Sequence, residues 1–216
     1  MSAEMYNKLA QAVIDGEAED AASLARQALE EGINPLACID NGLTKGIQEV
    51  GELFASGEYY LPELIIGADA MKAALDVLEP ALTGGQEREV VATVVLGTVE
   101  GDLHEIGKTL VGTMLIANGF NVVDIGVDQP ASEFINAIKE NDATIVGASA
   151  LLTTTMLQQK RIIDAIDGAG LREQVKVMVG GAPVTQSYAE QIGADGYAED
   201  AVSAVDLAFR LADAPA

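Results

Sequence analysis

Residues 90–95, Val90-Val91-Ala92-Thr93-Val94-Val95, are the stretch that decides the fold. Such a run of apolar, mostly β-branched residues is typical of a β-strand. An amphipathic helical segment follows it. The same alternation recurs in four further runs: Asn121 to Ile125, Thr144 to Ala148, Val175 to Val179, and a short one from Asp195 to Tyr197.

This alternation of strands and helices predicts a parallel sheet with right-handed crossovers, which makes this half of the chain an α/β domain. Five strands at this spacing fit a doubly wound, flavodoxin-like (Rossmann-like) domain. For such a domain the frequent strand order is 2-1-3-4-5.

The residues before this region are predicted to be helical. Apolar residues recur at helical spacing from Met5 to Val13 and again from Ala21 to Leu29. Pro35 suits the first turn of a third helix that runs to about Phe54, and Pro62 that of a fourth helix through Leu78. Four short helices with brief connections predict a small antiparallel four-helix bundle.

A polar, glycine-rich segment from Pro80 to Glu87 is expected to link the two halves. The predicted organisation is therefore a helical cap domain, residues 1–85, followed by an α/β domain, residues 86–216.

The composition excludes several classes of function. The 216 residues include 34 acidic and 12 basic ones, a net charge of −22, so the chain would repel a phosphate backbone and we expect no nucleic-acid partner. The amino terminus lacks the basic and apolar regions of a signal peptide. Since no stretch approaches 18 uninterrupted apolar residues, we expect no membrane contact and a cytoplasmic protein.

Three polar or glycine-rich segments follow predicted strands: Gly101 to Gly107 after the first strand, Ser149 to Thr155 after the third, and Gly180 to Pro183 after the fourth. In doubly wound sheets ligands bind beyond the carboxyl ends of the strands, near the point where the strand order reverses. We therefore expect these segments to flank one crevice.

His104, the only histidine, lies in the first of these segments, two residues after Asp102. Lone histidines are more often structural or solvated than ligands. A metal-bound imidazole, however, commonly donates its second ring N–H to a carboxylate, and Asp102 is placed to accept it. One histidine cannot hold a bare metal ion, but it can bind a metal whose other positions a macrocycle fills.

The other polar positions keep ordinary alternatives. Ser149, Thr153 and Thr155 could cap the following helix, and Gly180-Gly181 could form a simple turn or give clearance to a ligand that passes the backbone. The loop 101–107 matches neither a P-loop nor a dinucleotide-binding fingerprint, so nucleotide hydrolysis is disfavoured.

Together these residues resemble the cobalamin-binding domains of corrinoid proteins and of cobalamin-dependent methionine synthase. That family carries Asp-x-His-x-x-Gly, then Ser-x-Leu, then Gly-Gly. The present chain has Asp102-x-His104-x-x-Gly107, Ser149-x-Leu151 and Gly180-Gly181 in the same order. The resemblance extends to the helical half, where the segments from Val50 to Phe54 and from Gly57 to Glu63 look like the family's capping bundle.

The resemblance implies a bound cobalamin or related corrinoid, cycling between methylcob(III)alamin and cob(I)alamin. His104 would be the lower axial cobalt ligand, and Asp102 would bond to its other nitrogen. Thr155 stands where methionine synthase has a relay serine, and proton uptake through Asp102 and Thr155 would accompany release of the histidine. Phe54 and Leu61 match the apolar residues that cover the upper face of the corrin, although helical spacing alone would make them bundle core. The remaining cofactor-binding residues implied are Gly101, Leu103, Glu105, Ile106, Gly107, Ser149, Leu151, Thr153, Gly180 and Gly181.

The implied function is that of a methyl carrier, not a complete enzyme. Its expected partners are a substrate:corrinoid methyltransferase, a second methyltransferase acting on coenzyme M or tetrahydrofolate, and an ATP-dependent reductive activase. The methyl donor, which could be a methylamine, a quaternary amine, methanol or a methoxylated aromatic, is left open. A cobalamin-based sensor or regulator is the alternative. Such sensors typically use a tryptophan and a DNA-binding module, and this chain has no Trp. An adenosylcobalamin mutase subunit fits less well, since it lacks such a cap.

Overall fold

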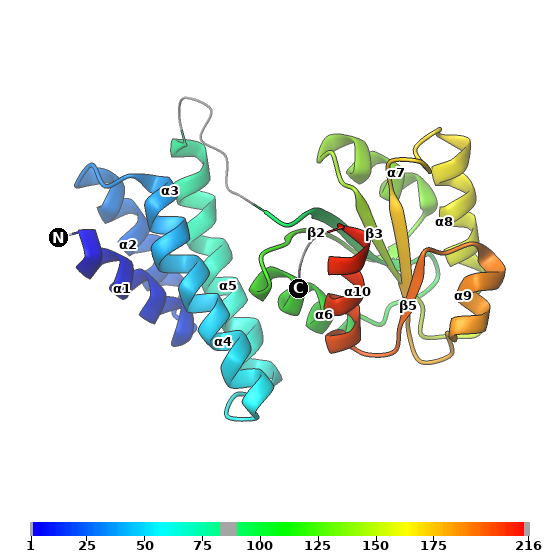
Figure 1. Cartoon of the computed structure of the whole chain (residues 1–216), viewed down its shortest axis with the longest axis horizontal. Helices are drawn as coiled ribbons and strands as arrows, with labels where there is room; N and C mark the ends of the chain where they lie inside the picture. Colours follow the sequence, from blue (N-terminus) through cyan, green and yellow to red (C-terminus); the bar gives the residue numbers. More distant parts are fainter. Residues whose placement is uncertain (1, 83–89, 214–216) are drawn as a thin grey trace. The chain divides into compact units, whose positions relative to one another are not determined.

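The computed structural model describes residues 2–82 and 90–213. The chain forms two compact units, one made mainly of Met1–Glu89 and the other mainly of residues 90–216 (Figure 1). The domain boundary expected between residues 85 and 86 lies outside the described residues. So does the expected linker from Thr83 on, whereas Pro80 and Ala81 belong to a short 3-10 helix, η2 (Glu79–Ala81).

The first unit is a helical bundle, as predicted (Figure 1). Helix α1 packs on α2 and α4, and α5 packs on α2 and α4. The helices approach closely because small residues occupy the contacts. A Cβ on Gly46 of α4 would lie 2.6 Å from the backbone oxygen of Ala10 in α1. The bounds of these helices are α1 (Ser2–Ile14), α2 (Ala18–Glu30), α3 (Pro35–Cys38), α4 (Thr44–Ser56) and α5 (Leu61–Leu78).

The third predicted helix, Pro35 to Phe54, is helical over this length but not a regular α-helix. A π-helical turn, η1 (Ile39–Leu43), separates α3 from α4. The helix begins as the sequence suggests: Asn34 caps α3 by accepting a hydrogen bond from the backbone N–H of Ala37 at 3.1 Å, and Pro35 takes the first turn.

The second unit contains a parallel five-stranded sheet in the order β2-β1-β3-β4-β5, which confirms the predicted doubly wound topology. The strands are β1 (Thr93–Val99), β2 (Asn121–Gln129), β3 (Ile145–Ser149), β4 (Lys176–Gly180) and β5 (Gly196–Ala198). The helices between and after them are α6 (Ile106–Ala117), α7 (Ala131–Glu140), α8 (Met156–Gly168), α9 (Gln186–Ile192) and α10 (Ala201–Leu211).

Both faces of this sheet are covered, which explains the continuous apolar runs of its strands. Helices α7, α8 and α9 pack on the face that includes Val95, and α6 and α10 pack on the face that includes Val94 (Figure 1). Phe134 of α7 and Phe120, just before β2, are fully buried in the two respective cores.

The predicted bounds of the first strand were wrong. The strand begins at Thr93, not Val90, and continues past Val95 through Gly97 and Thr98 to Val99. Gly97 does not end it, because the missing side chain leaves room for its neighbours. A Cβ there would lie 2.7 Å from Cγ1 of Ile125 and 2.8 Å from Cζ of Phe134.

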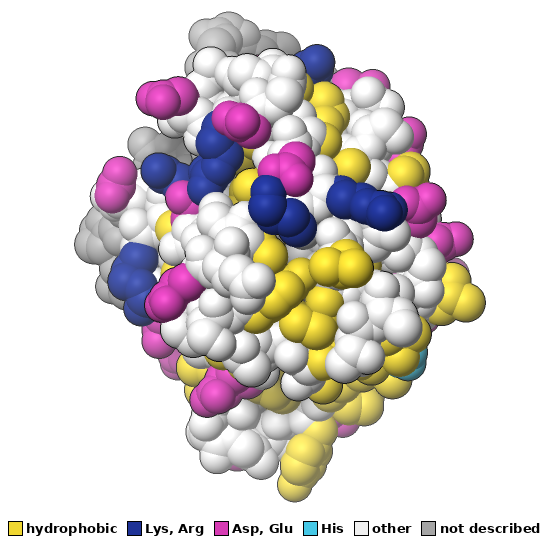
Figure 2. All heavy atoms as spheres, turned by 90° about the vertical axis from the view of Figure 1, so that its right-hand side faces the viewer, with side chains coloured by type: hydrophobic (Ala, Val, Ile, Leu, Met, Phe, Trp, Pro, Cys, Tyr) yellow, Lys and Arg dark blue, Asp and Glu magenta, His cyan; other side chains and the backbone are white. Residues whose placement is uncertain are grey.

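Acidic side chains are dispersed over one face of the molecule (Figure 2). Figure 2 shows acidic side chains spread across the face it presents, with Lys and Arg side chains among them and hydrophobic ones between. Such a mixture is expected of a solvated surface. Within residues 2–82 and 90–213, no helix combines the length and the apolar character needed to cross a bilayer.

Candidate functional site

The three segments singled out in the sequence meet at the carboxyl edge of the sheet. Thr98 at the end of β1 pairs with Ser149 at the end of β3, and Ser149 pairs with Gly180 at the end of β4. The loops that leave these strands are therefore neighbours, as the topology predicts.

His104 and Asp102 are joined side chain to side chain in the first of these loops. Nδ1 of His104 lies 2.7 Å from Oδ1 of Asp102, and the backbone N–H of His104 donates to the same oxygen at 3.2 Å. Asp102 is fully buried, whereas the imidazole side chain is 52% exposed. An ionised carboxylate only accepts hydrogen bonds, so Nδ1 carries the proton, and the lone pair of Nε2 is free for a ligand.

The second oxygen of Asp102 is held from across the sheet edge. Oδ2 accepts hydrogen bonds from the backbone N–H of Leu151 at 2.7 Å and from the hydroxyl of Thr155 at 2.7 Å. Burial alone would raise the pKa of this carboxyl. The hydrogen bonds, of which those from His104 and Thr155 are the strongest, outweigh burial and hold the pKa of Asp102 well below its usual range.

Thr155 joins this group instead of capping α8. It occupies the N-cap position, but its side chain makes no capping hydrogen bond, so the capping alternative is wrong for this residue. Its hydroxyl lies 2.7 Å from Asp102 Oδ2 and 2.9 Å from the backbone oxygen of Leu152. A donor at the position of the relay serine is thus present and aimed at Asp102.

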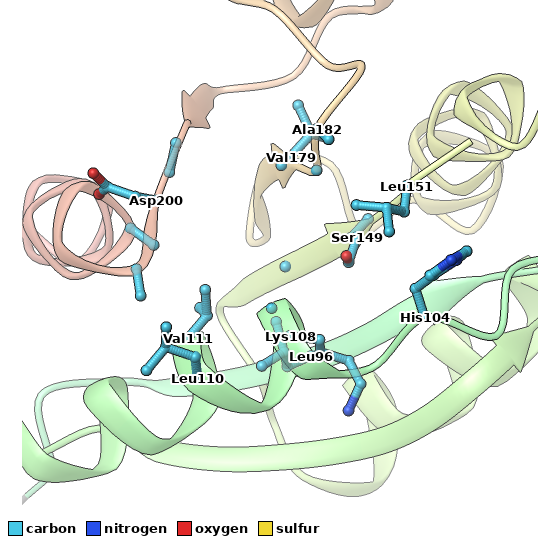
Figure 3. A pocket seen from close by; sticks show the side chains of 18 of the residues that line it. Leu96, His104, Lys108, Leu110, Val111, Ser149, Leu151, Val179, Ala182 and Asp200 are labelled. Atoms are coloured by element: carbon cyan, nitrogen blue, oxygen red, sulfur yellow. The ribbon is translucent and has the colours of Figure 1, made fainter. Parts of the chain in front are cut away.

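A cavity of about 650 Å³ opens beside His104 and runs between the strand ends and the first residues of α6 and α10. Figure 3 shows His104 and Asp200 at opposite ends of it. The residues predicted from the sequence that line this cavity are Leu103, His104, Glu105, Ile106, Gly107, Ser149, Leu151, Gly180 and Gly181.

The remaining predicted residues lie elsewhere. Gly101 belongs to the same loop as Asp102, and Thr153 is exposed beyond the end of β3. Phe54 of α4 and Leu61 at the start of α5 are half-buried residues of the helical unit. Their expected role over the cofactor stays a prediction.

Gly181 at the cavity edge has a reason of its own to be glycine. Its φ is +121°, and a Cβ there would lie 1.9 Å from the backbone oxygen of Ala150. The glycine therefore lets the loops after β3 and β4 touch, a structural reason beside the two alternatives that the sequence left open, a simple turn or clearance for a ligand. Both glycines still contribute to the cavity wall.

Two buried polar residues near the site were not found in the sequence. The Thr98 hydroxyl, fully buried in β1, donates to the backbone oxygen of His104 at 2.8 Å. Lys108, buried in the first turns of α6, forms an ion pair with Asp124 of β2 and lines the cavity with its stem. In the sequence, these two residues could have been found as a threonine within an apolar strand and a lysine within an apolar helix.

These residues fit a corrinoid better than a free metal ion. Among residues 2–82 and 90–213, no group of three or more His, Cys, Asp and Glu side chains could hold a metal. The imidazole is a single, oriented donor. Leu103 and Ile106 beside it are 72% and 73% exposed, which suits contact with a large, mostly apolar macrocycle.

Both halves of the chain match known families. Residues 92–206 match the B12 binding domain family, and residues 5–79 match a second B12 binding domain family. Dimethylamine corrinoid protein 1 of Methanosarcina mazei is 45% identical over 208 residues, 96% of each chain. Trimethylamine corrinoid protein 1 of Methanosarcina acetivorans is 45% identical over 203 residues, 94% of each chain.

Among solved structures, a chain of the methanol:cobalamin methyltransferase complex from Methanosarcina barkeri superposes with a TM-score of 0.85 at 32% identity. The match covers 98% of this chain and 81% of that one. With its helical and α/β halves both matched, this chain belongs to the corrinoid proteins of the B12-binding family.

Proposed function

We propose that this corrinoid protein carries a methyl group between two methyltransferases and is not itself a catalyst. The observation that carries the proposal is the Asp102–His104 pair, in which a buried carboxylate holds Nδ1 of a half-exposed imidazole and leaves Nε2 free. The relatives support the carrier role, since they are named as the corrinoid proteins of dimethylamine and trimethylamine and as part of a methanol methyltransferase.

A bound corrinoid would supply the nucleophilic cobalt to which the methyl group is attached and from which it leaves. The protein supplies ligation, orientation and shelter. Nε2 of His104 would hold the cobalt, with Asp102 fixing the tautomer and ring orientation of the imidazole. The cavity beside His104 would hold part of the cofactor, and Phe54 and Leu61 of the helical unit are proposed as further cofactor-binding residues.

Asp102 and Thr155 determine which atom of this hydrogen-bonded group can bind the metal. Nδ1 already carries a proton, and both oxygens of Asp102 are engaged by hydrogen-bond donors. Nε2 of His104 is therefore the atom of this group that is left to bind the metal.

The methyl donor is proposed to be selected by the partner enzyme. Relatives named for dimethylamine and for trimethylamine are equally similar to this chain, 45% identical in both cases. The overall sequence identity between this chain and its relatives thus does not depend on the amine for which each relative is named. The proposed partners are a substrate-specific methyltransferase, a methyltransferase acting on coenzyme M or tetrahydrofolate, and a reductive activase.

Electron paramagnetic resonance (EPR) of the protein loaded with hydroxocobalamin and reduced to Co(II) tests the ligand. The wild type should show superhyperfine coupling to one axial nitrogen. His104→Ala should abolish it, and added imidazole should restore it in the variant. Identical spectra of wild type and variant would overturn the proposal.

The carrier role has its own test. The loaded protein, reduced further to the cob(I)alamin state, should be methylated once by methyl iodide with release of iodide, as followed in the visible spectrum. It should keep the methyl group until a cognate methyltransferase is added. Sustained turnover of a methylamine or methanol by the protein alone would contradict the role. Phe54→Ala and Leu61→Ala should increase photolysis of the methylated protein.

A further inference from the structure

Asp128 has an unusual backbone conformation for its place in the fold. It lies near the end of β2 with a φ of +56°, in the left-handed region that L-residues other than glycine rarely adopt. The two other aspartates with positive φ, Asp142 and Asp213, directly follow helices or a helix-terminal turn, where this conformation is common. No helix end accounts for Asp128.

The end of β2 is irregular in a way that brings Asp128 to the His104 loop. In its pairing with β1, Leu96 matches Asp124 and Gly97 matches Gly126, so one residue of β2 is extra. A second register shift follows before Val99 matches Gln129. Bulges of this kind bend a strand and re-aim its side chains, and they are frequent beside functional sites.

Asp128 holds the His104 loop with two groups at once. Its backbone N–H donates to the backbone oxygen of Asp102 at 2.9 Å, and its Oδ1 accepts from the backbone N–H of Gly101 at 2.6 Å. Gly101 itself has a φ of +81°. The peptide group before Gly101 and the peptide group after Asp102 are thus both held by Asp128.

The two hydrogen bonds of Asp128 fix the backbone of Asp102, the residue that orients the imidazole. Asp102 can direct Oδ1 to His104 and Oδ2 to Leu151 only if its backbone is fixed. Backbone strain persists only where the surroundings enforce it, and it clusters at functional sites.

We propose that Asp128 is a positioning residue for His104: by clamping Gly101 and Asp102, it holds the Asp102 carboxylate where it fixes the imidazole as an axial ligand. The inference rests on the proposed function in one respect: that the imidazole binds the cobalt of a corrinoid. The orientation of the imidazole can be measured without any cofactor.

The experiment compares Asp128→Gly with Asp128→Asn. Glycine adopts a positive φ without strain but removes the carboxylate, so the variant should fold. Asparagine tolerates this φ and keeps an acceptor oxygen, so it should restore the wild-type behaviour. Asp142→Gly is the matched control, because Asp142 is exposed, has a φ of +49° and lies in the turn after α7.

The first readout is the His104 Nδ1–H resonance of the apoprotein, which is unambiguous because the chain has one histidine. This signal should be sharp in the wild type, Asp128→Asn and Asp142→Gly, and lost to exchange in Asp128→Gly. The second is the fraction of Co(II) with axial nitrogen in the loaded protein. We expect the ratio of bound to unbound histidine to fall about tenfold in Asp128→Gly, as for loss of one hydrogen bond to a charged group.

The two hypotheses fail in different ways. Asp128→Gly with an unchanged Nδ1–H resonance and an unchanged axial fraction, even with a lower melting temperature, would make Asp128 merely structural and overturn this inference. Absence of axial nitrogen coupling in the wild type would instead overturn the proposed ligation by His104, whatever the resonance shows.

Discussion

Oδ1 of Asp102 lies 2.7 Å from Nδ1 of His104, and the carboxylate that makes this contact is fully buried. A buried charge persists only when hydrogen bonds compensate for the water it has lost. For Asp102 the donors come from its own loop and from the residues after β3. The stability of the α/β unit and the orientation of the imidazole therefore depend on the same carboxylate.

The first prediction concerns pH. The pKa of Asp102 is lowered in the folded protein, so the unfolded chain binds more protons as the pH falls. The stabilising contribution of Asp102 is present above its unfolded pKa of about 3.9 and is lost as the pH falls below that value. In Asp102→Asn, the amide NH2 group would also face the hydrogen-bond donors of His104, or of Leu151 and Thr155. The free energy of unfolding at pH 7 should therefore fall by about 1–3 kcal/mol.

Urea denaturation at a series of pH values checks this prediction. The difference in unfolding free energy between wild type and Asp102→Asn should shrink as the pH falls below about 4. A difference that does not change with pH would mean that the carboxylate charge contributes nothing.

The second prediction concerns the Thr155 hydroxyl. Thr155→Val keeps the shape but removes the donor to Asp102, so the free energy of unfolding should fall by about 2 kcal/mol. Thr155→Ser retains the donor and should cost less than half as much. Thermal unfolding of the two apoproteins measures the difference. Equal losses would show that the methyl packing of Thr155, not its hydrogen bond, is what matters.

The third prediction concerns the strand-end glycine. Gly181→Ala combines a φ of +121° with a Cβ that would overlap the backbone oxygen of Ala150, so it should destabilise the protein by about 3 kcal/mol or more. Gly193→Ala is the control, since Gly193 has a φ of +80° but no atom within 4 Å of its Cβ position. The control should lose only about 1 kcal/mol in chemical denaturation. A similar loss in both variants would argue against a close contact of the two loops.

The fourth prediction concerns the cavity. Ser149→Leu puts bulk into the space beside His104, and corrinoid affinity should fall about tenfold or more while the apoprotein stays folded. Ser149→Ala removes only the hydroxyl and should lower the affinity about fivefold, as for one hydrogen bond. Equilibrium dialysis with hydroxocobalamin measures both. Wild-type affinity in Ser149→Leu would show that the cofactor does not use this cavity.

The topology and the meeting of three loops could be predicted because they follow from local patterns. Apolar β-branched runs mark the strands, and parallel strands bring their carboxyl ends to one edge. The bounds of β1 could not be predicted, because whether Gly97 breaks or continues a strand depends on Ile125 and Phe134 packing into its space.

The contribution of Asp128 was invisible in the sequence for a related reason. The positive φ of Asp128 and the two register shifts arise from the pairing of β2 with β1, and no pattern in the neighbouring residues predicts them. Thr155, by contrast, was found through a family pattern of residue types. The proposed cover of the cofactor by Phe54 and Leu61 stays a prediction.

The donors to Asp102 have a consequence for the biogenesis of the protein. Leu151 and Thr155 are 49 and 53 residues beyond Asp102 in the chain, and their hydrogen bonds form only after β3 has paired beside β1. Contacts between such distant residues are slow to form during folding. A nascent chain ending before β3 would therefore carry the Asp102–His104 pair without Leu151 and Thr155, the donors that hold the second oxygen of Asp102. Once bound, the cofactor would shift the equilibrium toward the native state by mass action.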